Sequence, residues 1–284
     1  MNIGIVGLGL IGGSLALDLR NLGHRIFGVS RRVSTCQLAL DRAIVDEAST
    51  DLSLLAIADV IFVCTPIAAI LPTVKELIDY LSPHTVVTDV GSVKTPIVEA
   101  ITPLWPNFVG GHPMAGTAES GIEAAQFNLF ADAPYITTPI DTTPSPALEV
   151  VENLARSLHS RIFRCSPPNH DQAVAWISHL PVMASASLIA ACIGEPDPAV
   201  VSLAQHLASS GFRDTSRVGG GNPELGVMMA QYNRSSLLPA LQSYRVFIDQ
   251  FIGYIEAEDW EALETVLRQT QQARPLFLSP AKNN

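Results

Sequence analysis

Short apolar, β-branched runs alternate with helix-like patterns through the first half of the chain. The runs that predict strands are residues 3–6, 25–29, 60–64, 85–90 and 108–110. Between the first two runs, Leu15, Leu19 and Leu22 recur at helical spacing, and Gly23 follows as a stop signal. This alternation is typical of βαβ units, so we expect a parallel sheet with helices packed on it.

The strand signals end midway along the chain. Two more strands are expected at residues 135–138 and 161–165, and beyond Ser166 the pattern is helical. Glycine and proline predict breaks in the helical part at residues 194–196, at Gly211 and at residues 219–223.

We therefore expect two domains in a chain of 284 residues. The first, residues 1–166, is predicted to be an α/β Rossmann-type domain with a mostly parallel sheet. The second, residues 167–284, is predicted to be an all-α domain for substrate binding and dimerisation.

One long helix of the second domain carries an apolar stripe with a spacing of three to four residues. Its members are Leu237, Leu241, Tyr244, Phe247, Phe251 and Tyr254. The stripe fits core packing within the domain as well as it fits a dimer interface. We expect a homodimer that forms through the helical domain.

Composition narrows the class of protein. Hydrophobic residues make up 48% and charged residues 15%, which is typical of a globular protein and excludes a disordered one. The formal net charge of −10 disfavours nucleic-acid binding, because a polyanion would be repelled. An anionic substrate would therefore need a locally basic pocket.

No targeting or membrane segment is expected. The uncharged opening, residues 1–17, lacks the basic start of a signal peptide, and the neutral stretch at residues 180–194 is shorter than a membrane span of about 20 residues. A cytoplasmic protein fits best. The four cysteines form no CxxC pair, so we expect reduced core residues and neither a metal site nor a disulfide framework. They are Cys36, Cys64, Cys165 and Cys192.

A Gly-x-Gly-x-x-Gly motif, Gly7, Gly9 and Gly12 with Leu10 and Ile11 between them, follows the first predicted strand and opens a helix. In this context the motif indicates a dinucleotide site. The first glycine permits a tight turn, the second lets the backbone approach a pyrophosphate, and the third lets helix and strand pack closely. The helix N-terminus supplies N–H donors.

The end of the second strand indicates which cofactor binds. NAD-preferring domains usually carry Asp or Glu here, whereas this chain has Ser30, Arg31 and Arg32. Serine and guanidinium groups bind a 2′-phosphate that a carboxylate would repel, so we expect NADP. Alternatively, the two arginines are simply a solvated pair on a loop.

Three further segments leave carboxyl ends of predicted strands, where ligands of open α/β sheets bind. Thr65 and Pro66 are expected to border the cofactor. A loop with Ser92 and another with His112 can both face the nicotinamide. Oxidation of an alcohol by hydride transfer needs a group that takes the hydroxyl proton, and histidine suits that task near neutral pH, so His112 is the candidate base.

Four motifs in one order make the chain resemble the prephenate/arogenate dehydrogenase family of tyrosine biosynthesis. They are the glycine motif, residues 89–94 (Asp-Val-Gly-Ser-Val-Lys), residues 111–116 (Gly-His-Pro-Met-Ala-Gly) and residues 212–217 (Phe-Arg-Asp-Thr-Ser-Arg). The resemblance extends over nearly the whole chain. It is greatest to the single-module, NADP-using arogenate dehydrogenases, and it implies oxidative decarboxylation of arogenate to tyrosine, with prephenate as the alternative substrate.

The resemblance also implies roles for four residues. His112 would hydrogen-bond the ring C4 hydroxyl, and Ser92 would orient it. Arg217 would bind a substrate carboxylate, although an interdomain salt bridge would also explain an arginine here. His179 lies in a His-Leu-Pro segment that the family shares, and we expect it to touch substrate.

The chain departs from the family pattern in two places. Val182 stands where many prephenate-using relatives have a second histidine, and the segment at residues 219–223 (Gly-Gly-Gly-Asn-Pro) is unusual. Both departures are compatible with a preference for arogenate, and neither demonstrates it.

Two other functions fit a Rossmann domain followed by helices. One is a β-hydroxyacid dehydrogenase with a catalytic lysine in its helical domain, but the lysines are Lys75, Lys94 and Lys282, of which only the last, in the tail, belongs to that domain. The other is an NADP sensor without catalysis, which would leave Ser92 and His112 without a task.

Overall fold

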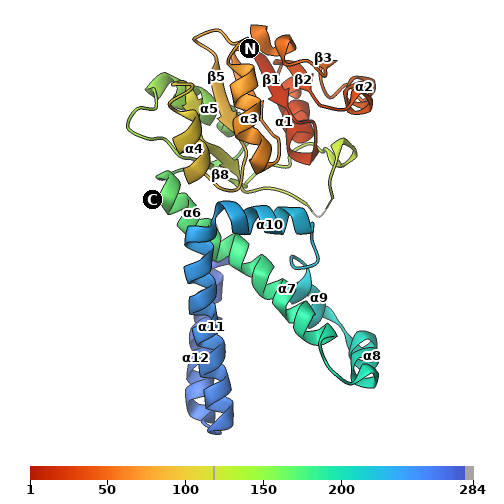
Figure 1. The fold of residues 1–284 in the computed structure, drawn as a ribbon, viewed down its shortest axis with the longest axis vertical. Helices are drawn as coiled ribbons and strands as arrows, with labels where there is room; N and C mark the ends of the chain where they lie inside the picture. Colours follow the sequence, from red (N-terminus) through yellow and green to blue (C-terminus); the bar gives the residue numbers. More distant parts are fainter. Residues whose placement is uncertain (118, 279–284) are drawn as a thin grey trace. The chain divides into compact units, whose positions relative to one another are not determined.

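The computed structural model describes residues 1–117 and 119–278, and a six-stranded parallel sheet forms the centre of its first part (Figure 1). The strands are β1 (Asn2–Val6), β2 (Arg25–Val29), β3 (Glu47–Ser49), β4 (Val60–Val63), β5 (Val86–Asp89) and β6 (Phe108–Val109). Their order in the sheet, β3-β2-β1-β4-β5-β6, confirms the predicted Rossmann-type topology. Ligands of such sheets bind beyond the carboxyl ends of β1 and β4, where the strand order reverses.

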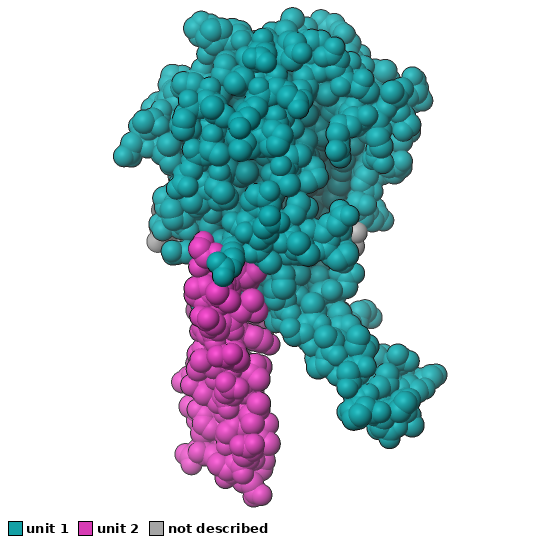
Figure 2. Space-filling view, viewed as in Figure 1, with its two compact units in different colours: residues 1–234 teal, residues 235–284 magenta. Residues whose placement is uncertain are grey.

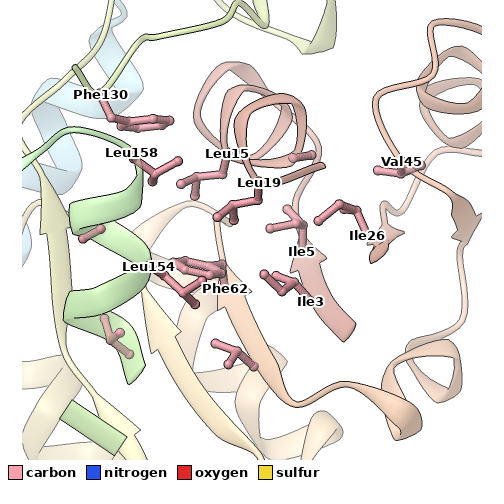
Figure 3. Close-up of a cluster of buried hydrophobic side chains, with 14 of the residues drawn as sticks. Ile3, Ile5, Leu15, Leu19, Ile26, Val45, Phe62, Phe130, Leu154 and Leu158 are labelled. Carbon is pink, nitrogen blue, oxygen red and sulfur yellow. The ribbon is translucent and has the colours of Figure 1, made fainter. Parts of the chain in front are cut away.

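Side chains alternate between the two faces of the sheet, as the period of two along a strand requires. In β4, Val60 and Phe62 belong to one buried cluster, and Ile61 and Val63 belong to the other. Figure 3 shows the first cluster, in which Phe62 lies among side chains from two helices that cover the same face.

Helices cover both faces. They are α1 (Leu10–Asn21), α2 (Val33–Asp41), η1 (Leu52–Ile57), α3 (Ile67–Leu77), α4 (Thr95–Ile101), η2 (Ile122–Ala124) and α5 (Ser145–Ser157). Leu15 and Leu19 of α1 are fully buried, and Gly23 adopts φ +87° just beyond the helix, so the predicted helix and its stop are confirmed. The apolar side chains of α1 and α5 pack on one face of the sheet, whereas those of α3 and α4 pack on the other.

A second, three-stranded sheet lies next in the chain. Its strands are β7 (Gly111–Pro113), β8 (Pro134–Thr137) and β9 (Arg161–Arg164), with β7 antiparallel and β9 parallel to β8. The two later strands match the sequence prediction. The loop expected around His112 is wrong, however, because this residue pairs with Ile136 as the middle residue of β7. With only three residues, β7 is too short for its sequence to show the alternation that predicts a strand.

One continuous helical stretch opens the helical part and consists of α6 (Pro167–Val174), η3 (Ala175–His179) and α7 (Leu180–Ile193) (Figure 1). The side chain of Ser166 caps its first turn by accepting a hydrogen bond from the N–H of Asn169, and Pro167 supplies a fixed φ at the first position. Its middle turn, η3, is a π-helix.

By length and composition this stretch, Pro167–Ile193, could cross a membrane, with a mean hydropathy of 1.6 over its most apolar window. A lone apolar helix of this length is weak evidence for a span. His170 and Asp171 near its start are only 2% and 3% exposed and hydrogen-bond to groups of the chain, so its first turns are in a protein environment.

The remaining helices are α8 (Pro198–Leu207), α9 (Ser210–Ser216), α10 (Pro223–Tyr232), α11 (Arg234–Glu256) and α12 (Trp260–Leu278). The breaks predicted near Gly194 and Pro223 are confirmed. The break predicted at Gly211 lies slightly earlier, between Leu207 and Ser210, and Gly211 itself is the second residue of α9. A lone glycine lowers helix propensity by only about 1 kcal/mol, which the flanking residues offset here.

By contacts the chain divides into two compact units, residues 1–234 and 235–284 (Figure 2). The first unit therefore includes α6 to α10 together with both sheets. The described part of the second consists of most of α11 and of α12. On α11 the residues Tyr244 and Phe247 of the predicted stripe are 39% and 52% exposed in the single chain.

Replacement of Gly7 by Ala should destabilise the protein, because Gly7 has φ +98° and an added Cβ would lie 2.6 Å from the carbonyl oxygen of Cys64. We expect a loss of about 1–3 kcal/mol in unfolding free energy, measured by urea denaturation. Gly9→Ala is the matched control, since nothing lies within 4 Å of its added Cβ. Equal losses for the two variants would contradict this account of the turn.

Candidate active site

The glycine turn at the end of β1 leaves an open space beside the start of α1. An added Cβ at Gly12 would lie 2.0 Å from the carbonyl oxygen of Gly7, so helix and strand are in direct contact there. Gly9 precedes the helix and has no neighbour within 4 Å of its Cβ position. Leu10 and Ile11 form the first turn of α1 and are half-buried. The turn thus offers helix N–H groups to a pyrophosphate at Gly9.

Ser30, Arg31 and Arg32 follow β2, the neighbour of β1. Ser30 is half-buried, and its Oγ accepts a hydrogen bond from the N–H of Arg32. Both arginines are exposed, and neither forms an ion pair within residues 1–117 and 119–278. Their guanidinium groups are therefore available to an anion at this edge of the sheet.

Thr65 and Pro66 lie where β4 ends and α3 begins. The Oγ1 atom of Thr65 is buried, and it has no hydrogen-bond partner among the described residues. A buried hydroxyl without a partner costs free energy unless a ligand or water satisfies it. The residues around β1 and β4 thus fit a dinucleotide: a glycine turn with open space, helix N–H groups and an unpaired hydroxyl.

A buried carboxylate at the end of β5 connects the two predicted catalytic segments. Asp89 accepts hydrogen bonds from the N–H groups of Gly91 (2.8 Å) and Gly111 (3.2 Å). The ammonium group of Lys94 forms an ion pair with Asp89 and also donates to the carbonyl oxygen of Gly111 (2.7 Å). Both side chains of the pair are fully buried. Gly91 and Lys94, which flank Ser92, and Gly111, which precedes His112, are thereby all bound to the carboxylate of Asp89.

His112 lies beside a second histidine that the sequence prediction missed. Its Nδ1 is 2.8 Å from Nε2 of His170, and Nδ1 of His170 is 2.8 Å from Oδ1 of Asp171. The two imidazole rings meet edge to face at 71°. Asp171 also accepts from the N–H groups of Lys94 (2.7 Å) and Thr95 (2.8 Å) at the start of α4. A chain of hydrogen bonds thus connects His112 to a carboxylate on α6.

His179, the last residue of η3, is fully buried within the same unit. Its Nδ1 is 3.1 Å from the side-chain nitrogen of Asn233, which also donates to the carbonyl oxygen of Asp171 (2.8 Å). Its Nε2 is buried without a partner among the described residues, as is Oγ of Ser92. Two buried polar atoms therefore remain available to a ligand near His112 and Asp171.

Arg217 follows α9 and is exposed, without an ion pair in the described part of the chain. The salt bridge considered as an alternative is thus not formed there. Ser185 of α7 holds the segment by donating to the carbonyl oxygen of Thr215 and accepting from the N–H of Gly219, both at 2.8 Å. An added Cβ at Gly219 would lie 2.3 Å from the backbone nitrogen of Ala186, which explains one of the three glycines. Among the described residues, no hydrogen bond or ion pair joins the side chain of Arg217 to the histidine cluster.

Burial governs the electrostatics of the cluster. Removal from water, reinforced by His170 and Lys94, lowers the pKa of His112 well below its usual range. Burial likewise lowers the pKa of His179 to about 4. The pKa of Asp171 is lowered, because hydrogen bonds from His170 and from the start of α4 outweigh its burial. His112 and His179 are therefore neutral at physiological pH, and Asp171 is ionised.

The sequence prediction thus missed His170, Asp171 and Asn233, as well as the pairing of Asp89 with Lys94. Asp89 and Lys94 lie at the two ends of the motif at residues 89–94. The Asn-His-Asp run at residues 169–171 carried a further signal, because it places two adjacent titratable groups just after the predicted domain boundary.

The other sequence predictions concern lysine and cysteine. Lys94 lies in the first domain as expected, and Lys282 is outside the described residues. Of the four cysteines predicted to be core residues, Cys36 is buried and Cys64 and Cys165 are half-buried, whereas Cys192 is exposed and the prediction is wrong for it. No cluster of His, Cys, Asp or Glu among the described residues is arranged to hold a metal ion.

Two family models match the chain in succession. The model described as "Prephenate dehydrogenase, nucleotide-binding domain" matches residues 15–164. The model described as "Prephenate dehydrogenase, dimerization domain" matches residues 166–269.

Individual relatives agree with these matches. The chain is 33% identical to the prephenate dehydrogenase of Bacillus subtilis, over 91% of this chain and 71% of the relative. It is 57% identical to a Synechocystis arogenate dehydrogenase of known structure, with a TM-score of 0.87 and coverage of 98% and 100%. A prephenate dehydrogenase from A. aeolicus, solved with hydroxyphenyl propionate and NAD+, is 28% identical, with a TM-score of 0.92 and coverage of 98% of each chain.

Replacement of Lys94 by Met should cost about 3–5 kcal/mol of unfolding free energy, because Asp89 would remain as an unpaired buried charge. The double variant Asp89→Asn/Lys94→Met should recover part of that loss. Urea denaturation of the two variants measures both effects. Lys75→Met, at an exposed position of α3, is the control and should change stability by no more than about 0.5 kcal/mol. A Lys94→Met variant as stable as this control would refute the stabilising role of the Asp89–Lys94 ion pair.

Proposed function

Because the chain belongs to the prephenate dehydrogenase family, we propose that it catalyses the NADP-dependent oxidative decarboxylation of arogenate to tyrosine. Membership makes it an oxidoreductase with a nicotinamide cofactor. The observation that carries the choice of arogenate is the 57% identity to an arogenate dehydrogenase over 98% of this chain. Val182, where many prephenate-using relatives have histidine, is compatible with that choice.

Prephenate is the second candidate substrate. The relatives from Bacillus subtilis and A. aeolicus are prephenate dehydrogenases. The two substrates share the reacting ring and differ by an amino or a keto group on the side chain, so the same residues would serve either reaction. The product from prephenate would be 4-hydroxyphenylpyruvate.

We propose that the glycine turn, the first turn of α1, Thr65 and Pro66 hold the dinucleotide. The A. aeolicus relative was solved with NAD+. In this chain, however, Ser30 and two exposed arginines stand at the end of β2, and no carboxylate is there to bind a ribose diol. These residues support NADP. When bound, the nicotinamide accepts the hydride that leaves C4 of the substrate ring.

His112 is proposed to take the proton of the C4 hydroxyl, and Ser92 to orient that hydroxyl. As the C4–H bond breaks, C4 becomes a carbonyl conjugated to C1, the ring carbon that bears a carboxylate. The C1–carboxylate bond then breaks, its electron pair enters the ring, and CO2 leaves. The phenolate oxygen so formed recovers the proton from His112, and aromatisation drives the step. His112 is neutral before the reaction because burial lowers its pKa, so it can act as a base.

Arg217 is proposed to bind a substrate carboxylate, and His179 to offer its unpaired Nε2 to the substrate. A planar guanidinium can hold a carboxylate with two hydrogen bonds, and the net charge of −10 makes such a local cation necessary for an anionic substrate.

We further propose that two copies of the chain associate through the helical part and that the enzyme works in the cytoplasm. The match to a dimerization domain over residues 166–269 supports the first point. So do the exposed apolar side chains of α11, which include Tyr244, Phe247, Ile252 and Ile255.

The proposed function predicts how kcat/KM ranks among the four combinations of substrate and cofactor. Steady-state kinetics with arogenate or prephenate, each with NADP or NAD, should give the highest kcat/KM for arogenate with NADP. The His112→Ala variant should lower kcat by about 10²-fold or more without weakening cofactor binding. A higher kcat/KM for prephenate would overturn the choice of substrate. A near-normal kcat in the variant would remove His112 from the mechanism.

Cofactor choice should reside in the residues that follow β2. The Arg31→Ala/Arg32→Ala variant should lose on the order of 10²-fold in NADP affinity, because charge-assisted contacts to phosphate contribute roughly 1.5–3 kcal/mol each before solvent screening. NAD affinity should hardly change, and Ser30→Asp should shift the preference further toward NAD. Fluorescence titration at fixed ionic strength measures each dissociation constant.

Arg25→Ala is the matched control for this experiment. Arg25 is an exposed arginine at the opposite end of β2, where it pairs with Glu47. Its loss should leave NADP binding unchanged. A double variant that binds both cofactors as the wild type does would show that Arg31 and Arg32 are a solvated pair.

A further inference from the structure

Three side chains in the first unit form a row of hydrogen bonds that general base catalysis by one histidine does not require. Both ring nitrogens of His170 are engaged, Nε2 with His112 and Nδ1 with Asp171, each at 2.8 Å. His170 is 2% exposed and Asp171 is 3% exposed. His112 is 7% exposed, and its Nε2 makes no hydrogen bond within residues 1–117 and 119–278.

The carboxylate determines where the protons lie. An ionised carboxylate only accepts hydrogen bonds, and Asp171 already accepts from the N–H groups of Lys94 and Thr95. Nδ1 of His170 must therefore carry a proton. In a neutral imidazole the other nitrogen is then a lone-pair acceptor, so Nε2 of His170 accepts from Nδ1–H of His112. This leaves Nε2 of His112 with a lone pair.

The opposite arrangement would require a cationic His170 that donates from both nitrogens. Besides Asp171, the charged or titratable groups that face the two rings are Lys94, the Asp89 paired with it, and His179. Burial disfavours a second cation there, and the charge of Asp171 is already shared with two backbone N–H groups. The neutral arrangement is the one that these groups favour.

We propose that Asp171 and His170 are positioning residues that hold His112 in the tautomer whose Nε2 can take a proton. This inference rests on the proposed function for the identity of the proton donor, the C4 hydroxyl. After the transfer, the imidazolium of His112 keeps its Nδ1–H bond to His170, and Asp171 compensates the positive charge through that ring. When the phenolate recovers the proton, the row returns to its starting state.

The position of the row in the fold gives it a second property. His112 comes from β7, whereas His170 and Asp171 come from the first turns of α6, so the base is functional only when these two elements are in register. Asp171 also accepts hydrogen bonds from the start of α4, the helix that follows the Ser92 loop. Asp171 thus binds both the ring that positions His112 and the start of the helix that follows the Ser92 loop, which is proposed to orient the substrate.

Asp171→Asn removes the anion from the row. Oδ1 of Asp171 accepts from both Nδ1 of His170 and the N–H of Lys94, whereas Oδ2 accepts from Thr95. An asparagine whose NH2 group replaces Oδ1 would donate to Nδ1 of His170 and lose the bond from Lys94. The protons would then shift along the row and place a hydrogen on Nε2 of His112. We expect kcat to fall by about 10²–10⁴-fold, as such carboxylate-to-amide exchanges do in serine protease triads. The acid limb of the kcat/KM profile should also move to lower pH, because the anion that stabilises the imidazolium is lost.

Nitrogen-15 NMR of the histidine rings gives a readout that does not depend on turnover. In the wild type, Nδ1 of His112 should show the signal of a protonated nitrogen and Nε2 that of an unprotonated one. A wild-type His112 protonated on Nε2 would overturn the proposal, as would an unchanged kcat in Asp171→Asn.

A second pair of variants leaves the N-terminal hydrogen bonds of α4 intact. His170→Gln keeps an amide oxygen that can accept from Nδ1–H of His112, whereas His170→Leu removes the acceptor. The first should retain at least ten times the kcat of the second, at similar thermal stability. Equal losses would assign His170 a purely structural role and would overturn the proposal.

Asp18→Asn is the matched control, because this buried carboxylate of α1 also accepts from a backbone N–H, that of Asn128, outside the site. It should leave both kcat and the pH profile unchanged. If the wild type oxidises neither arogenate nor prephenate, the proposed function fails, whereas the ring-nitrogen assignments still decide the tautomer.

Discussion

The anion of Asp89 is the constraint on which the arrangement of the site depends. A carboxylate buried at the end of β5 needs its hydrogen bonds and its countercharge, and the chain supplies them from Gly91, Gly111 and Lys94. Two segments that are distant in the sequence therefore meet at one point. The cost of burying the ion pair is offset only while all three partners are in place, which makes the geometry around Ser92 and His112 specific.

The sequence was most informative where a residue type is demanded by local geometry. Gly7 needs a positive φ and Gly12 needs room against the preceding turn, so their spacing between a predicted strand and a predicted helix indicates the dinucleotide turn. Five of the six parallel strands were equally readable, since each is a short apolar run, whereas β3, which is only Glu-Ala-Ser, was missed. His170, Asp171 and Asn233 could not be predicted in this way, because their partners come from other elements and no local pattern specifies such contacts. Gly211 shows a smaller error, because the break that it signalled lies just before it, between Leu207 and Ser210.

The site also combines an acidic protein with an uncharged reaction centre. His112 and His179 are buried and neutral, and the ionised Asp89 and Asp171 are saturated by donors of the chain itself. Little negative charge is thus left to repel an anionic substrate. The cations Arg31, Arg32 and Arg217 are exposed and lie in other segments of the chain.

The π-helical turn η3 acts on the phase of the helix that contains it. Nine positions separate His170 from His179, which is about 2.5 turns of a regular α-helix and would put them on opposite sides. A π turn absorbs one residue, so the effective separation is about 2.2 turns and both histidines can belong to one buried cluster. The extra residue turns every later position of α7 by the same angle, about 100°. The π turn therefore determines which side chains of α7 face inward and which face outward. An insertion or deletion in this turn would rotate both sets of side chains by the same angle.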